Sequence, residues 1–197
     1  MAIKRSRSAD TAERILDIAE PLVQMRGYNA FSYADVAAEL GVTKASLHYH
    51  FAGKAELGEA LISRYAERFG GALEAIDSDR ADAPAKLRAY ADLYSGVLRD
   101  GRMCLCGMLA ADYETLPQRA QESVVAFFDA NEAWLERVLE EGRDDGTLHF
   151  EGPARDTART IVTGLEGAML VARPYGDLDR FETTVTTLLT SLTGTAG

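Results

Sequence analysis

The strongest constraint on the fold of this chain lies near its N-terminus, where residues 32–54 read SYADVAAELGVTKASLHYHFAGK. Within this stretch, Ala37, Gly41 and Leu47 follow the spacing A-x3-G-x5-L. A small residue such as Ala37 lets a second helix cross closely over the first, and Gly41 can adopt the positive φ of a sharp turn. Leu47 then points back to hold the two helices together. The spacing therefore predicts a helix-turn-helix, whose second helix enters the major groove of DNA.

Capping residues support both short helices. Ser32 with Asp35 approximates a capping box for the first helix, and Thr43 is a favourable N-cap for the second. The exposed positions of the second helix are rich in hydrogen-bond donors and rings, namely Lys44, Ser46, His48, Tyr49 and His50. An ordinary solvated surface helix is the alternative interpretation of this composition.

Residues on both sides of the hairpin carry a family resemblance. They are Arg26-Gly27-Tyr28 at the end of the preceding helix, Phe31-Ser32, Val36-Ala37, Gly41-Val42-Thr43-Lys44, and Leu47-His48-Tyr49-His50-Phe51-Ala52-Gly53-Lys54. In this register the chain resembles the DNA-binding domain of TetR-type (TetR/AcrR) transcriptional regulators, over about residues 11–62. His48 is a departure, because the family most often has Tyr there, although a ring and a hydrogen-bonding group are kept.

The resemblance implies an all-α architecture of nine helices. It places a DNA-binding head in residues 1–54 and a helical body for effector binding and dimerisation in residues 55–197. It also implies two sets of DNA contacts. Bases or nearby phosphates would be contacted by Thr43, Lys44, Ala45, Ser46 and His48, and backbone phosphates by Ser32, Tyr33, Tyr49, His50 and Lys54.

Hydrophobic periodicity predicts helix along the whole remaining chain, with no alternating strand pattern. The first helix is expected over residues 9–26, with a bend or early boundary at Pro21, which lacks an N–H. A long fourth helix should run from residue 54 to about residue 76, followed by a loop over residues 77–84. The expected later helices cover residues 84–99, 103–115, 118–143, 153–172 and 178–193.

The net charge of −10 is unevenly distributed. Residues 1–54 hold seven basic and six acidic side chains, so residues 55–197 carry −11. An acidic body disfavours docking on DNA through the wrong face, although solubility alone also explains it. The basic residues Lys4, Arg5 and Arg7 either form an arm that reaches a DNA groove or are simply a solvated tail.

The composition favours a globular protein over a membrane-spanning or secreted one. The chain has 197 residues, 47% of them hydrophobic and 26% charged, which is typical of a soluble globular protein. No apolar run approaches the roughly 20 residues that span a bilayer, and no apolar segment of a secretory signal follows the basic N-terminus. Two cysteines do not make a disulfide framework, so we expect the reducing cytoplasm.

Small and apolar residues in the last two helices predict a dimer contact. The apolar positions recur every three or four residues, and the small ones let a second backbone approach closely. The expected interface residues are Ile161, Gly164, Gly167, Ala168, Phe181, Val185, Leu188 and Leu192. The alternative is that both stripes pack within one subunit. A dimer would present two recognition helices about 34 Å apart to a near-palindrome.

Two cysteines mark the middle of the body. Cys104 and Cys106 are two residues apart, so on a helix they point in different directions and cannot easily share a metal ion. Cys106 is interpreted as a small core residue. Cys104 is expected in the first turn of a helix and near Arg102, where a thiolate is stabilised. The hypothesis is a thiol that senses oxidants or electrophiles, and the alternative is an inert, partly buried thiol.

Large apolar residues on the middle helices suggest a pocket for an apolar or aromatic effector, although each of them also fits a plain core position. The candidates are Met103, Cys106, Met108, Leu109, Tyr113, Phe127, Phe128, Trp134, Leu165 and Met169.

We therefore expect a ligand- or redox-responsive regulator, a repressor that binds its operator as a homodimer. A Ser-His-Asp order, paired catalytic carboxylates, a phosphate loop and a metal cluster are all missing from the sequence, so we expect neither an enzyme nor a cofactor. The alternative is a helical interaction protein whose hairpin no longer binds DNA.

Overall fold

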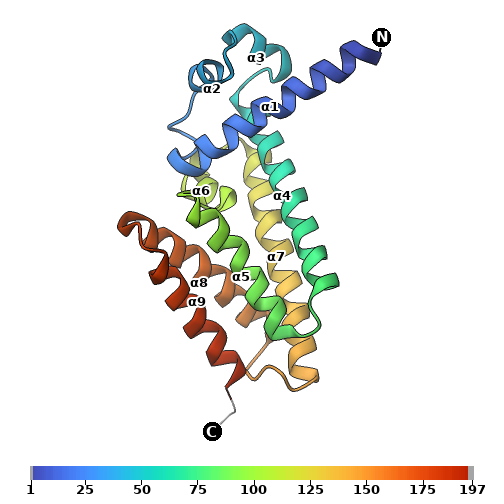
Figure 1. Ribbon diagram of the computed structural model, residues 1–197, viewed down its shortest axis with the longest axis vertical. Helices are drawn as coiled ribbons and strands as arrows, with labels where there is room; N and C mark the ends of the chain where they lie inside the picture. The colour runs from blue at the N-terminus through green and yellow to red at the C-terminus, as the bar shows by residue number, and fades with distance from the viewer. Residues whose placement is uncertain (1, 195–197) are drawn as a thin grey trace. The chain divides into compact units, whose positions relative to one another are not determined.

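The structure, a computed structural model, describes the backbone of residues 2–194 and the side chains of residues 10–194. Over this range it contains nine α-helices, one 3₁₀ turn and no strand, which confirms the predicted all-α class (Figure 1). The elements are α1 (Ala2–Arg26), α2 (Tyr33–Leu40), α3 (Lys44–His50), α4 (Lys54–Asp79), α5 (Ala83–Arg99), α6 (Leu105–Ala111), η1 (Tyr113–Thr115), α7 (Gln118–Asp144), α8 (Ala154–Tyr175) and α9 (Leu178–Thr193).

Several boundaries differ from the prediction, among them the end of α8, which lies at Tyr175 and not at residue 172. Helix α1 begins at Ala2, well before residue 9, and continues through Pro21. The loop predicted over residues 77–84 is shorter, because α4 extends to Asp79 and α5 already begins at Ala83. Asp82 caps α5 by accepting a hydrogen bond from the Ala85 N–H at 2.8 Å. A proline in the first turn suits this start, since the first backbone N–H groups of a helix have no partner within it.

The predicted helix over residues 103–115 is broken into two parts. Helix α6 covers only Leu105–Ala111, and the single turn η1 follows it after Asp112. Cys104 therefore precedes α6 and does not lie in its first turn, which corrects the expected position of this thiol. The side chains of Lys4, Arg5 and Arg7 lie outside the described residues, so the interpretation of these three as an arm or a tail stays open.

By packing, the chain divides into two compact units. The first unit consists of Met1–Ala66 and Leu105–Val125, and the second of Glu67–Cys104 and Ala126–Gly197. In the first unit, α1 packs on α2, α3 and α6. Its core includes the fully buried side chains of Ile15, Phe31, Leu47, Leu57 and Leu61.

The second unit is built around α5, α8 and α9, which contact one another pairwise, with α8 and α9 lying alongside each other (Figure 1). Its core includes Tyr90, Leu135, Leu139 and Phe181. The packing boundary falls inside α4, at Ala66 and Glu67, and α6 packs with the N-terminal helices. The division into residues 1–54 and 55–197 remains a prediction.

Candidate nucleic-acid interface and effector core

The hairpin has the turn and caps that its sequence predicts. Gly41 lies in the left-handed region at φ +72° and ψ +31°, and its N–H donates to the carbonyl of Ala37. Ser32 and Asp35 form a full capping box, in which the Asp35 carboxylate accepts from the Ser32 N–H at 2.7 Å. Thr43 caps α3 through a 3.3 Å hydrogen bond from the Ser46 N–H. These local interactions fix where α2 and α3 begin and how they turn.

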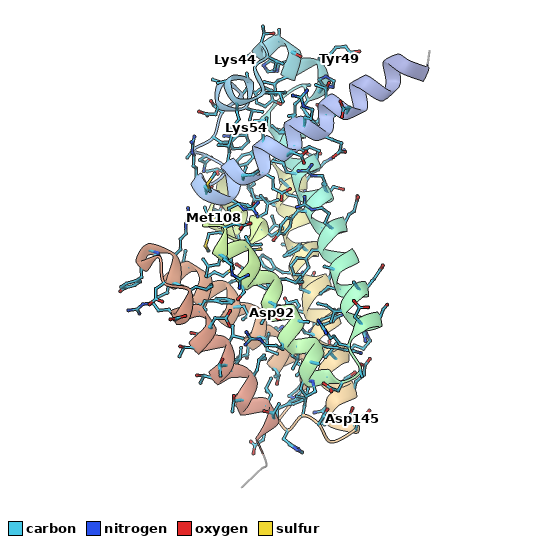
Figure 2. The ribbon with its side chains drawn as sticks, viewed as in Figure 1. Lys44, Tyr49, Lys54, Asp92, Met108 and Asp145 are labelled. Atoms are coloured by element: carbon cyan, nitrogen blue, oxygen red, sulfur yellow. The ribbon has the colours of Figure 1, made fainter. Side chains whose placement is uncertain are left out.

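One face of α3 is buried and the other is open to solvent. Leu47 is fully buried against the rest of the first unit. The outward side chains, which we call the recognition face, are those of Thr43, Lys44, Ala45, His48 and Tyr49. The Tyr49 side chain is 79% exposed and extends away from α3 (Figure 2). Ser46 and His50 are half-buried at the edges of this face.

Two predicted phosphate ligands have partners inside the first unit. Tyr33 is buried, and its hydroxyl donates to the carbonyl of Phe51 at 3.0 Å. This burial raises the pKa of Tyr33 to about 12. The ammonium of Lys54 donates to the carbonyl of Phe31 at 2.7 Å and lies 4.7 Å and 4.5 Å from the ring centres of Tyr28 and Phe31. Burial lowers the pKa of Lys54. Both side chains therefore help to hold the first unit together. Their contact with DNA stays a prediction.

His48, the departure from the family pattern, is tied back to its own hairpin. Its Nδ1 lies 3.1 Å from the carbonyl of Ala52, and its ring centre is 4.8 Å from that of Tyr33. Because Nδ1 has this partner and the residue is exposed, Nε2 is the ring nitrogen available for a further hydrogen bond. A single nitrogen at the surface suits one hydrogen bond to a base or phosphate, as a tyrosine hydroxyl would make.

An acid that the sequence did not single out connects α6 to the turn after α1. The Asp112 carboxylate accepts hydrogen bonds from the Tyr28 N–H at 2.7 Å, the Asn29 N–H at 3.3 Å and the Asn29 amide at 3.0 Å. Gly27 precedes these residues at φ +87°, and a Cβ there would lie 2.9 Å from Asp112 Oδ2. The pairing spans 84 residues of sequence, so no local pattern predicts it.

The predicted effector residues are divided between the two units. Cys106, Met108, Leu109 and Tyr113 belong to the first unit, and the other six to the second. Most of the ten are buried, whereas Met108 and Phe128 are half-buried and Tyr113 is exposed. The second unit has a surface hollow of about 580 Å³, but other residues line it, among them Arg143, His149 and Phe150.

Part of the predicted set joins an aromatic cluster in the second unit. Phe69 lies edge-on to Tyr90, Tyr94 and Phe127, at centroid distances of 6.0, 6.0 and 5.2 Å. Trp134 stacks on Tyr90 at 5.6 Å. The Tyr90 hydroxyl lies 3.1 Å from the Tyr94 hydroxyl and donates to Asn131 Oδ1 at 3.1 Å. Burial raises the pKa of both tyrosines, so they are neutral hydrogen-bonding groups.

Cys104 lies in an environment unlike the one its sequence suggests. The thiol is only 1% exposed, and its hydrogen-bond partner is the carboxylate of Glu166 on α8. Arg102 forms an ion pair with Asp100. Burial raises the pKa of Glu166 to about 7. The sequence analysis did not single out Glu166. An acid within the apolar segment of residues 164–170 could have indicated it.

Half of the predicted dimer residues have side chains that are buried inside the subunit. Ile161, Phe181, Val185 and Leu192 are buried in the monomer and therefore cannot present their side chains to a second copy. Gly164 faces Leu188 across α8 and α9, since a Cβ on Gly164 would meet the Leu188 side chain at 3.5 Å. Helical spacing reveals an apolar face but not which neighbour covers it.

The outer side of α8 keeps an apolar surface of its own. Leu170, Val171 and Tyr175 are 62%, 57% and 63% exposed, and we call them the α8 patch. Gly167 is exposed and Ala168 half-buried on the same helix. Exposed apolar residues gathered on one helix are typical of an interaction surface.

The described residues lack two further features. They contain no group of three or more His, Cys, Asp or Glu side chains placed to hold a metal ion. No helix among them has the length and apolar character needed to cross a membrane.

Comparison with known proteins agrees with the fold and the hairpin. Residues 15–61 match the family described as bacterial regulatory proteins, tetR family, and residues 83–188 match the tetracyclin repressor-like C-terminal domain. A TetR-family transcriptional regulator from Agrobacterium tumefaciens is 33% identical, with a TM-score of 0.91 over 95% of this chain and 100% of that chain. A TetR regulator from Legionella pneumophila is 34% identical, with a TM-score of 0.83 over 91% and 96% of the two chains.

Curated proteins give the same result. The transcriptional regulator AcuR of Cereibacter sphaeroides is 27% identical over 152 residues, which are 75% of this chain and 69% of AcuR. The two matched domains together cover most of the chain, and each is described by the same family of regulators. This chain belongs to the TetR family of helix-turn-helix transcriptional regulators.

Proposed function

We propose that the protein is a homodimeric repressor that binds a near-palindromic operator and releases it when a small molecule binds its second unit. The observation that carries DNA binding is the recognition face. Its side chains include a cation, a hydroxyl, an imidazole and a phenol, all exposed on a short helix whose opposite side is anchored by Leu47. Such groups hydrogen-bond to phosphates and to base edges in the major groove.

The small size of the recognition face is the reason for proposing a dimer. One helix of seven residues reads only a few base pairs, so a specific operator requires a second copy of α3. Two copies related by a two-fold axis read two half-sites of a near-palindrome. The α8 patch is the surface that we assign to this contact, in place of the buried residues expected from the helical wheel. Its exposed side chains would lose their contact with water in a dimer.

Release by an effector requires that the molecule bind one conformation of the protein better than another. The second unit contains the groups suited to this role, namely the aromatic cluster and the pair formed by Cys104 and Glu166. We favour reversible ligand binding over modification of Cys104, because a buried thiol that donates to a carboxylate is poorly placed to become an exposed thiolate.

Selection of binding sites from random double-stranded DNA tests the proposed function. The expected result is one enriched near-palindrome, bound as a 2:1 complex in gel-shift titrations. Lys44→Ala should weaken binding to it at least tenfold, whereas Arg155→Ala, which removes an exposed cation of the second unit, should leave the affinity unchanged. No enrichment even at low salt would instead favour a helical interaction protein whose hairpin does not bind DNA.

A further inference from the structure

Among the described residues of the second unit, Glu166 has a carboxylate oxygen that is buried without a hydrogen-bond partner. Its Oε1 is buried and has no hydrogen-bond partner in the protein, and its other interaction is with the thiol of Cys104. A thiol is a weak donor and cannot replace the hydration that a carboxylate loses on burial. Glu166 as a whole is half-buried, but its Oε1 is fully buried, so ionisation of this carboxyl carries an energetic cost.

The protein's own groups around Glu166 do not neutralise it. The side chains coupled to it electrostatically are Tyr90 and Tyr94 of α5 and Cys104, and the hydroxyls of Tyr90 and Tyr94 are paired with each other. Arg159, on the same helix as Glu166, pairs with Glu132 at 3.3 Å. Neutral hydroxyl groups and aromatic rings thus surround Glu166, but its Oε1 has no hydrogen-bond donor.

We propose that Glu166 is the counter-ion of the effector site, and that the effector is a small organic cation with an N–H donor, such as a primary ammonium attached to an apolar group. This inference rests on the proposed function, since it names the ligand class to which the second unit responds. An N⁺–H group bonded to a carboxylate makes one of the stronger hydrogen bonds available, particularly where water is excluded.

The side chains that interact with Glu166, and two methionines close to this pair in sequence, suit the remainder of such a ligand. Tyr90 and Tyr94 present aromatic rings, which attract cations and pack against apolar groups. Met103 precedes Cys104 in the chain, and Met169 follows Glu166 by about one helical turn. Both methionines are buried, and their flexible side chains can make room for a small molecule. The acidic balance of residues 55–197 also favours the approach of a cation over that of an anion.

Three ligands of similar shape but different charge test the proposal. Benzylamine is a cation at neutral pH, benzyl alcohol is neutral and benzoate is an anion. Their affinities for the full-length protein are measured by calorimetry at pH 8, in the absence of DNA. We expect millimolar or tighter binding of benzylamine, and at least tenfold weaker binding of the other two.

Two variants assign this preference to the proposed residue. Glu166→Gln keeps the shape of the side chain but removes its charge, and should weaken benzylamine binding at least tenfold. Glu140→Gln removes an exposed acid of α7 and should leave that affinity within twofold. Circular dichroism confirms that each variant is folded.

The inference is overturned if benzylamine does not bind at 10 mM, if benzyl alcohol binds equally well, or if Glu166→Gln retains the wild-type affinity. Because these measurements contain no DNA, their failure leaves the operator-binding proposal intact. Conversely, a protein that binds benzylamine through Glu166 but selects no operator would retain the inference about the site and lose the proposed function.

Discussion

Replacing Glu166 with glutamine should stabilise the protein at high pH and not at low pH. The pKa of this carboxyl is raised by burial from 4.5 to about 7. The folded state therefore binds the proton more tightly than the unfolded state does. Below pH 4.5 the group is protonated in both states and folding carries no penalty. As the pH rises to 7 the unfolded chain ionises more readily, and the folded state loses stability.

The size of this loss follows from the shift. Each pKa unit corresponds to about 1.4 kcal/mol, so the wild-type protein should lose up to about 3 kcal/mol between pH 4.5 and pH 7. The loss should stay constant at higher pH. Glutamine cannot ionise, so Glu166→Gln avoids this penalty. The difference in unfolding free energy between the variant and the wild type should grow across this range in favour of the variant.

Urea unfolding at a fixed protein concentration measures the difference, because the stability of the proposed dimer would depend on concentration. The single tryptophan, Trp134, is buried in the second unit and reports its unfolding by fluorescence. Glu140→Gln, which removes an exposed acid of α7, serves as the control for the loss of one charge. A difference between Glu166→Gln and the wild type that is the same at pH 5 and pH 8 would refute the argument from burial.

Three further results are expected. Lys54→Ala should lower the thermal stability of the protein, because the ammonium donates to a backbone carbonyl and contacts two rings. If Lys54 also binds a phosphate, this variant should reduce the salt dependence of DNA binding by about one counterion. An unchanged dependence of affinity on salt would show that the role of Lys54 is structural only. Gly27→Ala should destabilise the protein by about 1–3 kcal/mol more than Gly101→Ala does in chemical denaturation, since both glycines have positive φ but only a Cβ at residue 27 would meet the Asp112 carboxylate. Leu170→Glu should produce monomers in analytical ultracentrifugation without loss of helical content; a dimer of unchanged strength would exclude the α8 patch as the contact.

The hairpin shows how far local sequence information extends. Ala37, Gly41 and Leu47 determine a close helix crossing, and Ser32 and Thr43 determine where the two helices begin. Each of these effects acts over a few residues, so spacing and residue type were enough to predict them. The nine helices were predicted for the same reason, because an apolar face recurs every three or four residues along each one.

The partners of individual side chains were much less predictable. The phosphate contact expected of Lys54 stays a prediction, but no local pattern predicted that its ammonium donates to a carbonyl 23 residues earlier in the chain. Cys104 was expected beside a cation in the first turn of a helix. Its thiol instead donates a hydrogen bond to Glu166, an acid 62 residues later in the chain. Ile161 and Phe181 were expected at a dimer contact, yet both are buried in the subunit. A helical wheel specifies an apolar face and does not specify what covers it.

The amino-acid sequence by itself thus determined the fold class, the hairpin and the family, because these depend on short-range spacing, capping and periodicity. Only the tertiary structure decided which cations remain free, which apolar faces stay exposed and which acid is buried without a full set of partners. Those properties arise when segments distant in the chain pack together and exclude water. Glu166 is the clearest example, since its charge becomes costly only in the interior of the second unit.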